Sequence, residues 1–257
     1  MDQNTLVGRQ FGSTARNYLT SAVHSRGVDL QRLTDLAKRL QPSRILDLGC
    51  GGGHASYAVA AAGVGRVVAY DLSEEMLGIV KDEAVRRDLN NLTVQQGSVD
   101  ALPFADASFE LVVSRYSAHH WLRIDASIRE AARVLAPGGT LVVIDAIAPE
   151  TPLYDTALQT IELLRDASHV RDYRVSEWRA MLATAGLAVD NSDTWKLPLD
   201  FDAWIKRIGT PAARVAALRV TMEALPQEAR DYLAVRTDCS FSLDTAWIEA
   251  RRAAATT

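Results

Sequence analysis

Short apolar runs alternate with segments of helical periodicity along the first 150 residues of the chain. The runs predict strands near 44–48, 67–70, 92–96, 110–115 and 140–146. Continuous apolar runs are typical of strands that are buried on both faces, as in parallel sheets covered by helices. The pattern therefore predicts an α/β fold: a doubly wound, mostly parallel sheet with helices on both faces.

Helix-start signals lie between the predicted strands. Ser73 precedes Glu74 and Glu75, which predicts an N-cap followed by acidic residues in the first turn of a helix. Asp125 is expected to cap a second helix, and this helix is expected to end at the Ala-Pro-Gly-Gly segment 136–139.

The pattern becomes less regular after residue 150. Segment 187–257 indicates two closing strands separated by helical material around 201–236. Trp178, Trp195 and Trp204 lie in this part of the chain, and we interpret them as core residues of a cap rather than as a cage around a substrate.

A glycine-rich turn follows the first predicted strand, in segment 45–54. Gly49, Gly51 and Gly53 leave room for a ligand to touch bare backbone. Asp71 ends the second predicted strand and lies 20 residues after Gly51, where an acid in such folds accepts hydrogen bonds from ribose hydroxyls. Together they predict a site for an adenosine-containing ligand.

The turn departs from the dinucleotide fingerprint. A third glycine would be needed at position 54, where this chain has His54. Asp47 lies at the end of the first strand, where it would repel a pyrophosphate but could accept a hydrogen bond from an ammonium group. These residues favour a zwitterionic adenosine cofactor over a diphosphate.

Four segments follow one another in a characteristic order: Asp-Leu-Gly-Cys-Gly-Gly-Gly at 47–53, Asp-Leu-Ser at 71–73, Gly-Ser-Val-Asp-Ala-Leu-Pro-Phe at 97–104, and Arg-Val-Leu-Ala-Pro-Gly-Gly at 133–139. This series resembles the motifs of class I S-adenosylmethionine-dependent methyltransferases. It is most similar to the branch that includes the ubiquinone/menaquinone-biosynthesis enzymes (methyltransferase type 11). Segment 114–121 also resembles bacterial relatives of that branch.

The resemblance implies that the chain binds S-adenosylmethionine and releases S-adenosylhomocysteine. The glycines would admit the methionine and ribose, Asp71 would bind the ribose hydroxyls, and Leu72 and Met76 would cover the adenine. Relatives commonly carry Asp where this chain has Ser98. A serine accepts a hydrogen bond from the adenine amino group more weakly, so adenine recognition is expected to depend on the Val99 backbone. The alternative is that Ser98 is only a turn residue. The expected cofactor-binding residues are Asp47, Gly49, Gly51, Gly53, Asp71, Leu72, Met76, Ser98, Val99 and Ser114.

The resemblance also implies a domain organisation. A single class I methyltransferase domain is expected over 1–257, with a lid segment at 1–40, a cofactor-binding core at 42–147, and a cap with closing strands at 150–240. In this superfamily the last strands form an antiparallel pair, so helices inserted there would lie over the strand ends that hold the ligand.

Two adjacent histidines, His119 and His120, follow the fourth predicted strand. Ligands in open parallel sheets bind beyond the carboxyl ends of the strands, and histidine titrates near neutral pH. Either residue could act as the base for a methyl acceptor, or one could merely hydrogen-bond to backbone beside Trp121. The expected substrate-binding residues are Tyr18, His24, Arg115, Tyr116 and His169.

Composition narrows the class of protein. The 257 residues carry a formal net charge of −4 and no basic stripe, which argues against a nucleic-acid partner. The sequence has no apolar stretch of roughly 18 residues and no signal-peptide pattern, so we expect no membrane span and a cytoplasmic location. Cys50 and Cys239 are read as reduced thiols, and no spacing indicates a metal site.

Three functions remain open. The first is methyl transfer to a carbon or oxygen of a small-molecule substrate. The second is methylation of a carrier-protein-bound acyl carboxylate, because segment 11–18 faintly resembles that group. The third is cofactor binding without turnover. The quinone branch's Tyr-Asp-x-Met-Asn run is absent from this sequence, so the acceptor stays undetermined, as does the choice between monomer and homodimer.

Overall fold

The computed structural model describes the backbone of residues 2–19 and 27–254 and the side chains of 2–11 and 27–254. Its described part contains one eight-stranded sheet of order β3-β2-β1-β4-β5-β8-β7, with β6 beside β5. The strands are β1 Arg44–Leu48, β2 Arg66–Asp71, β3 Leu92–Gln96, β4 Phe109–Arg115, β5 Leu135–Ala148, β6 Tyr173–Arg174, β7 Leu187–Leu199 and β8 Phe241–Arg252.

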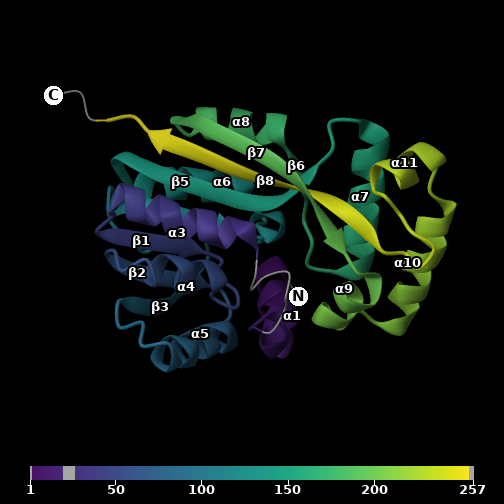
Figure 1. Ribbon diagram of the computed structural model, residues 1–257, viewed down its shortest axis with the longest axis horizontal. Coiled ribbons are helices and arrows are strands. Elements are labelled where there is room, and N and C mark those ends of the chain that lie inside the picture. The colour runs from purple at the N-terminus through teal and green to yellow at the C-terminus, as the bar shows by residue number, and fades with distance from the viewer. Residues whose placement is uncertain (1, 20–26, 255–257) are drawn as a thin grey trace.

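Helices cover both faces of the sheet (Figure 1). On one face α3 and α4 pack on residues such as Ile45 and Val142, and on the other α6 and α8 pack on Leu46 and Val143. The helices are α1 Gln3–Leu19, α3 Val28–Leu40, α4 His54–Ala60, α5 Glu74–Arg86, η1 Ala118–His120, α6 Ile124–Val134, α7 Pro152–Arg165, α8 Val175–Thr184, α9 Phe201–Ile208, α10 Ala212–Ala224 and α11 Gln227–Tyr232.

The predicted doubly wound α/β fold is confirmed. β1 to β5 pair in parallel, whereas β8 runs antiparallel to both β5 and β7. The central strands are largely apolar because helices cover both faces of the sheet, so side chains on either face are shielded from water. The predicted insertion between the closing strands is also present, as α9, α10 and α11.

Two local predictions about α6 are wrong. Asp125 is not the N-cap: the helix begins at Ile124, and Arg123 occupies the cap position. Asp125 lies in the first turn, where its charge still interacts favourably with the helix dipole. The helix ends at Val134, and segment 136–139 belongs to β5 rather than to the helix terminus. Ser73, by contrast, is the N-cap of α5 and accepts a hydrogen bond from the Met76 amide at 3.2 Å.

A helical cap packs against the far end of β5, β7 and β8 (Figure 1). Its core joins α7, α9, α10 and α11 through residues such as Ile161, Trp204, Leu218 and Phe241. Of the three tryptophans expected in the cap, only Trp204 belongs to this core. Trp178 packs in the core under α8, and Trp195 packs on the opposite face of the sheet.

The N-terminal forty residues divide into two parts. α3 lies on the sheet face against α4, where Leu33 and Leu36 are fully buried. α1 instead lies near α5 and α9, between the sheet and the cap (Figure 1). Within segment 1–40, therefore, α1 is the element that borders the space beyond the strand ends.

We expect Arg252→Ala to lower the free energy of unfolding by about 1–2 kcal/mol. Arg252 Nη1 on β8 donates to the carbonyl oxygens of Ala132, Arg133 and Leu135 at the end of α6, which have no partners inside the helix. Arg251→Ala is the matched control, with an expected cost below about 0.5 kcal/mol, because Arg251 makes an exposed ion pair with Asp190. Urea denaturation curves compare the two, and equal losses would contradict the capping role.

Candidate functional site

The glycine turn links β1 to α4. Gly49 and Gly53 have φ angles of +66° and +80°, in the left-handed region that favours glycine. A Cβ at Gly49 would lie 1.8 Å from Ser117 Oγ, and one at Gly53 would lie 2.7 Å from the Tyr57 ring. A Cβ at Gly51 would meet nothing within 4 Å, so at this residue the bare backbone faces open space.

Asp71 connects the turn to the end of β2. Its carboxylate accepts hydrogen bonds from the Gly51 amide at 2.8 Å and the Ser73 amide at 2.9 Å. Burial raises the pKa of Asp71, and the backbone amides partly oppose this shift. One carboxylate thus holds the glycine turn and the start of α5 together while it lines a cavity.

Asp47 lies beneath the turn at the end of β1. Its Oδ2 accepts a hydrogen bond from Ser56 Oγ at 2.6 Å, whereas Oδ1 is buried without a partner. Burial raises the pKa of Asp47 to about 6. A buried carboxylate oxygen without a donor, on the wall of a cavity, is suited to receive a hydrogen bond from a ligand.

The first cavity opens above the carboxyl ends of β1, β2 and β4 and encloses about 1010 Å³, including its mouth. Two of the predicted cofactor residues do not line it. Ser114 is fully buried within β4, and Gly53 shapes the turn as the residue before α4. Those on its wall are Asp47, Gly49, Gly51, Asp71, Leu72, Met76, Ser98 and Val99.

A second cavity of about 570 Å³ lies between the first cavity and the cap. The two share Phe11 of α1, Tyr116 and His120 as common wall residues. The remaining lining residues of the second cavity are His119, Ala146, Glu162, Arg165, Asp172, Leu197, Leu199, Trp204, Arg207 and Leu243.

The predicted substrate-binding residues are distributed unevenly. Tyr116 lies on both cavities, but Arg115 lines only the first. His169 is buried behind the second cavity, with its ring centroid 5.9 Å from that of His119. The side chain of Tyr18 and the whole of His24 lie outside the described residues.

His119 is held by an acid that the sequence analysis missed. Its Nδ1 lies 2.6 Å from Oδ1 of Asp145 on β5. The same carboxylate accepts hydrogen bonds from the amides of Ala118 and Ala146, so its orientation is fixed. Burial disfavours the charged imidazole, but the charge and hydrogen bond of Asp145 outweigh it and raise the pKa of His119 to about 9.

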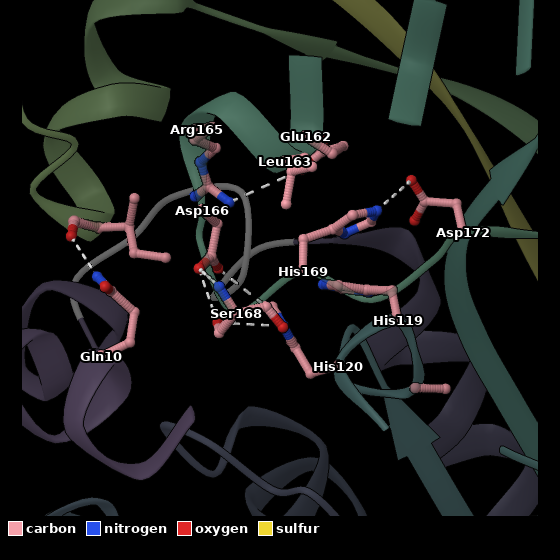
Figure 2. A network of polar contacts seen from close by, with 12 residues as sticks. Gln10, His119, His120, Glu162, Leu163, Arg165, Asp166, Ser168, His169 and Asp172 are labelled. Atoms are coloured by element: carbon pink, nitrogen blue, oxygen red, sulfur yellow. Dashed lines mark hydrogen bonds and ion pairs between the residues drawn. The ribbon is translucent and has the colours of Figure 1, made fainter. Parts of the chain in front are cut away.

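His120 has a different environment. Its Nδ1 donates to the Ser168 carbonyl oxygen at 3.1 Å, and its ring makes an edge contact with Phe11 at a centroid distance of 4.8 Å. Burial, followed by the charge of His119, lowers the pKa of His120 to about 4. Figure 2 shows His119 next to His169, with His120 turned toward Ser168. Of the two adjacent histidines, His119 is therefore paired with a carboxylate, whereas His120 is neutral.

Comparison with known proteins identifies the family. Residues 46–143 match the model of the "Methyltransferase domain" family. The chain is 36% identical over 221 residues to "Uncharacterized methyltransferase YcgJ" of Bacillus subtilis (strain 168), covering 86% of this chain and 87% of that protein. The crystal structure of YcgJ superposes with a TM-score of 0.81 at 33% identity, covering 87% of this chain and 99% of that one. The chain belongs to the class I methyltransferase family.

A second relative extends the similarity. "Uncharacterized protein YafE" of Escherichia coli (strain K12) is 47% identical over 195 residues, which are 76% of this chain and 94% of that protein. Both relatives match most of their own length, so the resemblance includes more than the glycine turn. The family expected from the four motifs is confirmed.

Two wall residues of this methyltransferase, Phe11 and Asp100, were not predicted from the sequence. Phe11 reaches the cavities because α1 packs between the sheet and the cap. Asp100 accepts hydrogen bonds from Ser98 Oγ at 2.5 Å and from Arg123 Nε at 2.8 Å beside the first cavity. Its place in the motif segment 97–104 could have drawn attention to it.

Two further features concern metal binding and membrane crossing by the described residues of this methyltransferase. The histidines, cysteines and carboxylates there form no group of three that could hold a metal ion. Among the same residues, every helix is too short or too polar to cross a membrane.

Proposed function

We propose that the protein transfers a methyl group from S-adenosylmethionine to an oxygen or carbon of a small-molecule metabolite. The observation that carries this proposal is the pair of adjoining cavities. The first lies over the glycine turn, and the second begins where Phe11, Tyr116 and His120 form a common wall. A displacement between two bound molecules requires such adjacent sites, because donor and acceptor must be aligned.

The residues of the first cavity fit the cofactor. The partnerless oxygen of Asp47 suits the amino group, and the open backbone at Gly51 leaves room for the methionine portion. Asp71 carries further acceptor capacity toward ribose hydroxyls. Leu72 and Met76 supply apolar surface for the adenine. When bound, the cofactor supplies an electrophilic methyl group on a sulfonium.

The second cavity supplies the acceptor side of the proposal. Asp145 accepts a hydrogen bond from Nδ1–H of His119, so the deprotonated, neutral imidazole presents a lone pair at Nε2. In this role His119 would take the proton of an acceptor hydroxyl or enol as the acceptor bonds to the methyl carbon, while the bond from that carbon to sulfur breaks and S-adenosylhomocysteine is the leaving group. His120, whose Nδ1 is engaged by Ser168, orients the acceptor at the boundary of the two cavities.

Calorimetry tests the cofactor part of the proposal. We expect S-adenosylmethionine and S-adenosylhomocysteine to bind, and NAD to bind at least about 100-fold more weakly, because a pyrophosphate would meet the carboxylates of Asp47 and Asp71 where the fingerprint glycine is missing. NAD binding of comparable affinity would contradict the proposal.

A further inference from the structure

Three buried polar side chains on the wall of the second cavity have unused hydrogen-bonding capacity. Glu162 and Arg165 of α7 and the nearby Asp172 are 6%, 8% and 1% exposed. The Glu162 carboxyl group makes an ion-pair contact with Arg165. Oδ2 of Asp172 lies 3.9 Å from His169 Nε2 and has no hydrogen-bond partner among the described residues. Buried polar groups are nearly always satisfied in folded proteins, so such groups around a cavity indicate a ligand.

Arg165 is oriented but only partly engaged. Its Nε donates to the Trp204 carbonyl oxygen at 3.3 Å, and its guanidinium lies 5.0 Å from the Trp204 ring centroid. Nη1 is 4.0 Å from Glu162 Oε2, beyond hydrogen-bond distance. Figure 2 shows the two side chains next to each other on α7. The planar guanidinium therefore retains donors that match a carboxylate.

The rest of the second cavity is largely apolar. Leu197, Leu199, Trp204 and Leu243 come from β7, α9 and β8 and are part of the cap core or pack against it. A pocket with apolar walls and a few convergent polar groups selects a ligand with an apolar body and one polar end.

We propose that Glu162, Arg165 and Asp172 bind the polar end of the methyl acceptor, and that this acceptor is an apolar hydroxy acid. The inference rests on the proposed methyltransferase function. Arg165 recognises the carboxylate, and the two carboxyl groups bind the hydroxyl. Because the heads of Glu162 and Arg165 lie 4.0 Å apart, the hydroxyl and carboxylate of the ligand must be neighbours.

The two acidic side chains do not exclude a ligand carboxylate. Burial raises the pKa of Glu162 and places that of Asp172 well above its ordinary value. A protonated carboxyl group both donates and accepts a hydrogen bond. The other charged or titratable groups at this cavity are His119, His120, Tyr116 and Arg207.

A stability measurement separates a ligand-binding role from a structural one. Groups kept unsatisfied for a ligand destabilise the free protein, so Glu162→Gln and Asp172→Asn are expected to leave Tm unchanged or raise it by about 2–4 °C. Asp155→Asn is the matched control on α7: this buried acid accepts hydrogen bonds from Gln159, Arg171 and Arg174, and its loss should lower Tm. Losses as large as the control's for both variants would overturn the inference.

A binding experiment tests the chemical class. The probes are 3-hydroxy-2-naphthoate, 2-naphthoate and 2-naphthol, titrated into the intact protein saturated with S-adenosylhomocysteine. We expect the hydroxy acid to bind at least about ten-fold more tightly than either single-group probe, as one added hydrogen bond to a charged group implies. In Glu162→Leu, which removes the hydrogen-bonding group, the advantage over 2-naphthoate should shrink.

The outcomes distinguish the inference from the function on which it rests. If S-adenosylhomocysteine binds but the hydroxy acid has no advantage, or no probe binds, the acceptor class is wrong while the cofactor site stands. If S-adenosylhomocysteine itself does not bind, the proposed function fails.

Discussion

Replacing His119 by alanine is expected to lower turnover by about 100-fold or more, while the affinity for S-adenosylmethionine stays nearly constant. The imidazole lines the second cavity and not the first, so its loss removes the proposed base and leaves the wall of the first cavity intact. The measurement pairs steady-state rates, using methyl-labelled cofactor and an acceptor found by screening metabolites, with calorimetry of cofactor binding.

His120→Gln is the control for this substitution. His120 is neutral and occupied by the Ser168 carbonyl, so its replacement should cost less turnover than the loss of His119. If alanine variants of both histidines retained full turnover on the true acceptor, the pair would be structural and the enzyme would act by alignment of its substrates alone.

The pH dependence gives a second readout of His119. A base acts in its deprotonated form, so turnover should rise with pH and level off above about 9, the value to which Asp145 raises the pKa. Asp145→Asn removes that charge, so the rise in turnover should move to lower pH. A profile that does not shift in Asp145→Asn would contradict the assignment.

The ion pair of His119 with Asp145 should also stabilise the fold. This stabilisation is fully present below the ordinary histidine pKa of 6.5 and is lost as pH rises through about 9.

Replacing Asp71 by alanine is expected to weaken cofactor binding by about 1.5–3 kcal/mol, the scale of hydrogen bonds to a charged group. The carboxylate accepts hydrogen bonds from the Gly51 and Ser73 amides and lines the first cavity, so the substitution removes the proposed ligand contact and the anchor of the glycine turn together. Calorimetry with S-adenosylhomocysteine measures the loss directly.

Glu74→Ala is the matched control for Asp71. Glu74 begins α5 three residues later, is exposed and lies outside the cavity wall. Its replacement should leave cofactor affinity unchanged. Unchanged affinity in a folded Asp71→Ala variant, judged by circular dichroism, would remove Asp71 from the site.

Local patterns predicted many of the residues that the glycine turn and its neighbours contribute to the wall of the first cavity. The apolar runs predicted β1 to β5, because strands buried on both faces leave the same signal wherever they pair. The glycine turn and Asp71 were recognisable because a backbone with positive φ and close ligand approach restricts the residue type at each position. Ser114 is buried within β4 and does not line the first cavity, because position along a strand does not reveal which way a side chain faces.

The acceptor side could be predicted only in outline. The amino-acid pattern predicted the fold class, the glycine turn and the place of the histidine pair, because each leaves a signal within a short stretch of the chain. Tertiary structure decided that Asp145 pairs with His119 rather than His120, that Phe11 of α1 separates two cavities, and that Glu162, Arg165 and Asp172 face one of them. Whether a charged side chain is buried, and which hydrogen-bond partners it has, is set by elements that come from distant parts of the chain and pack together.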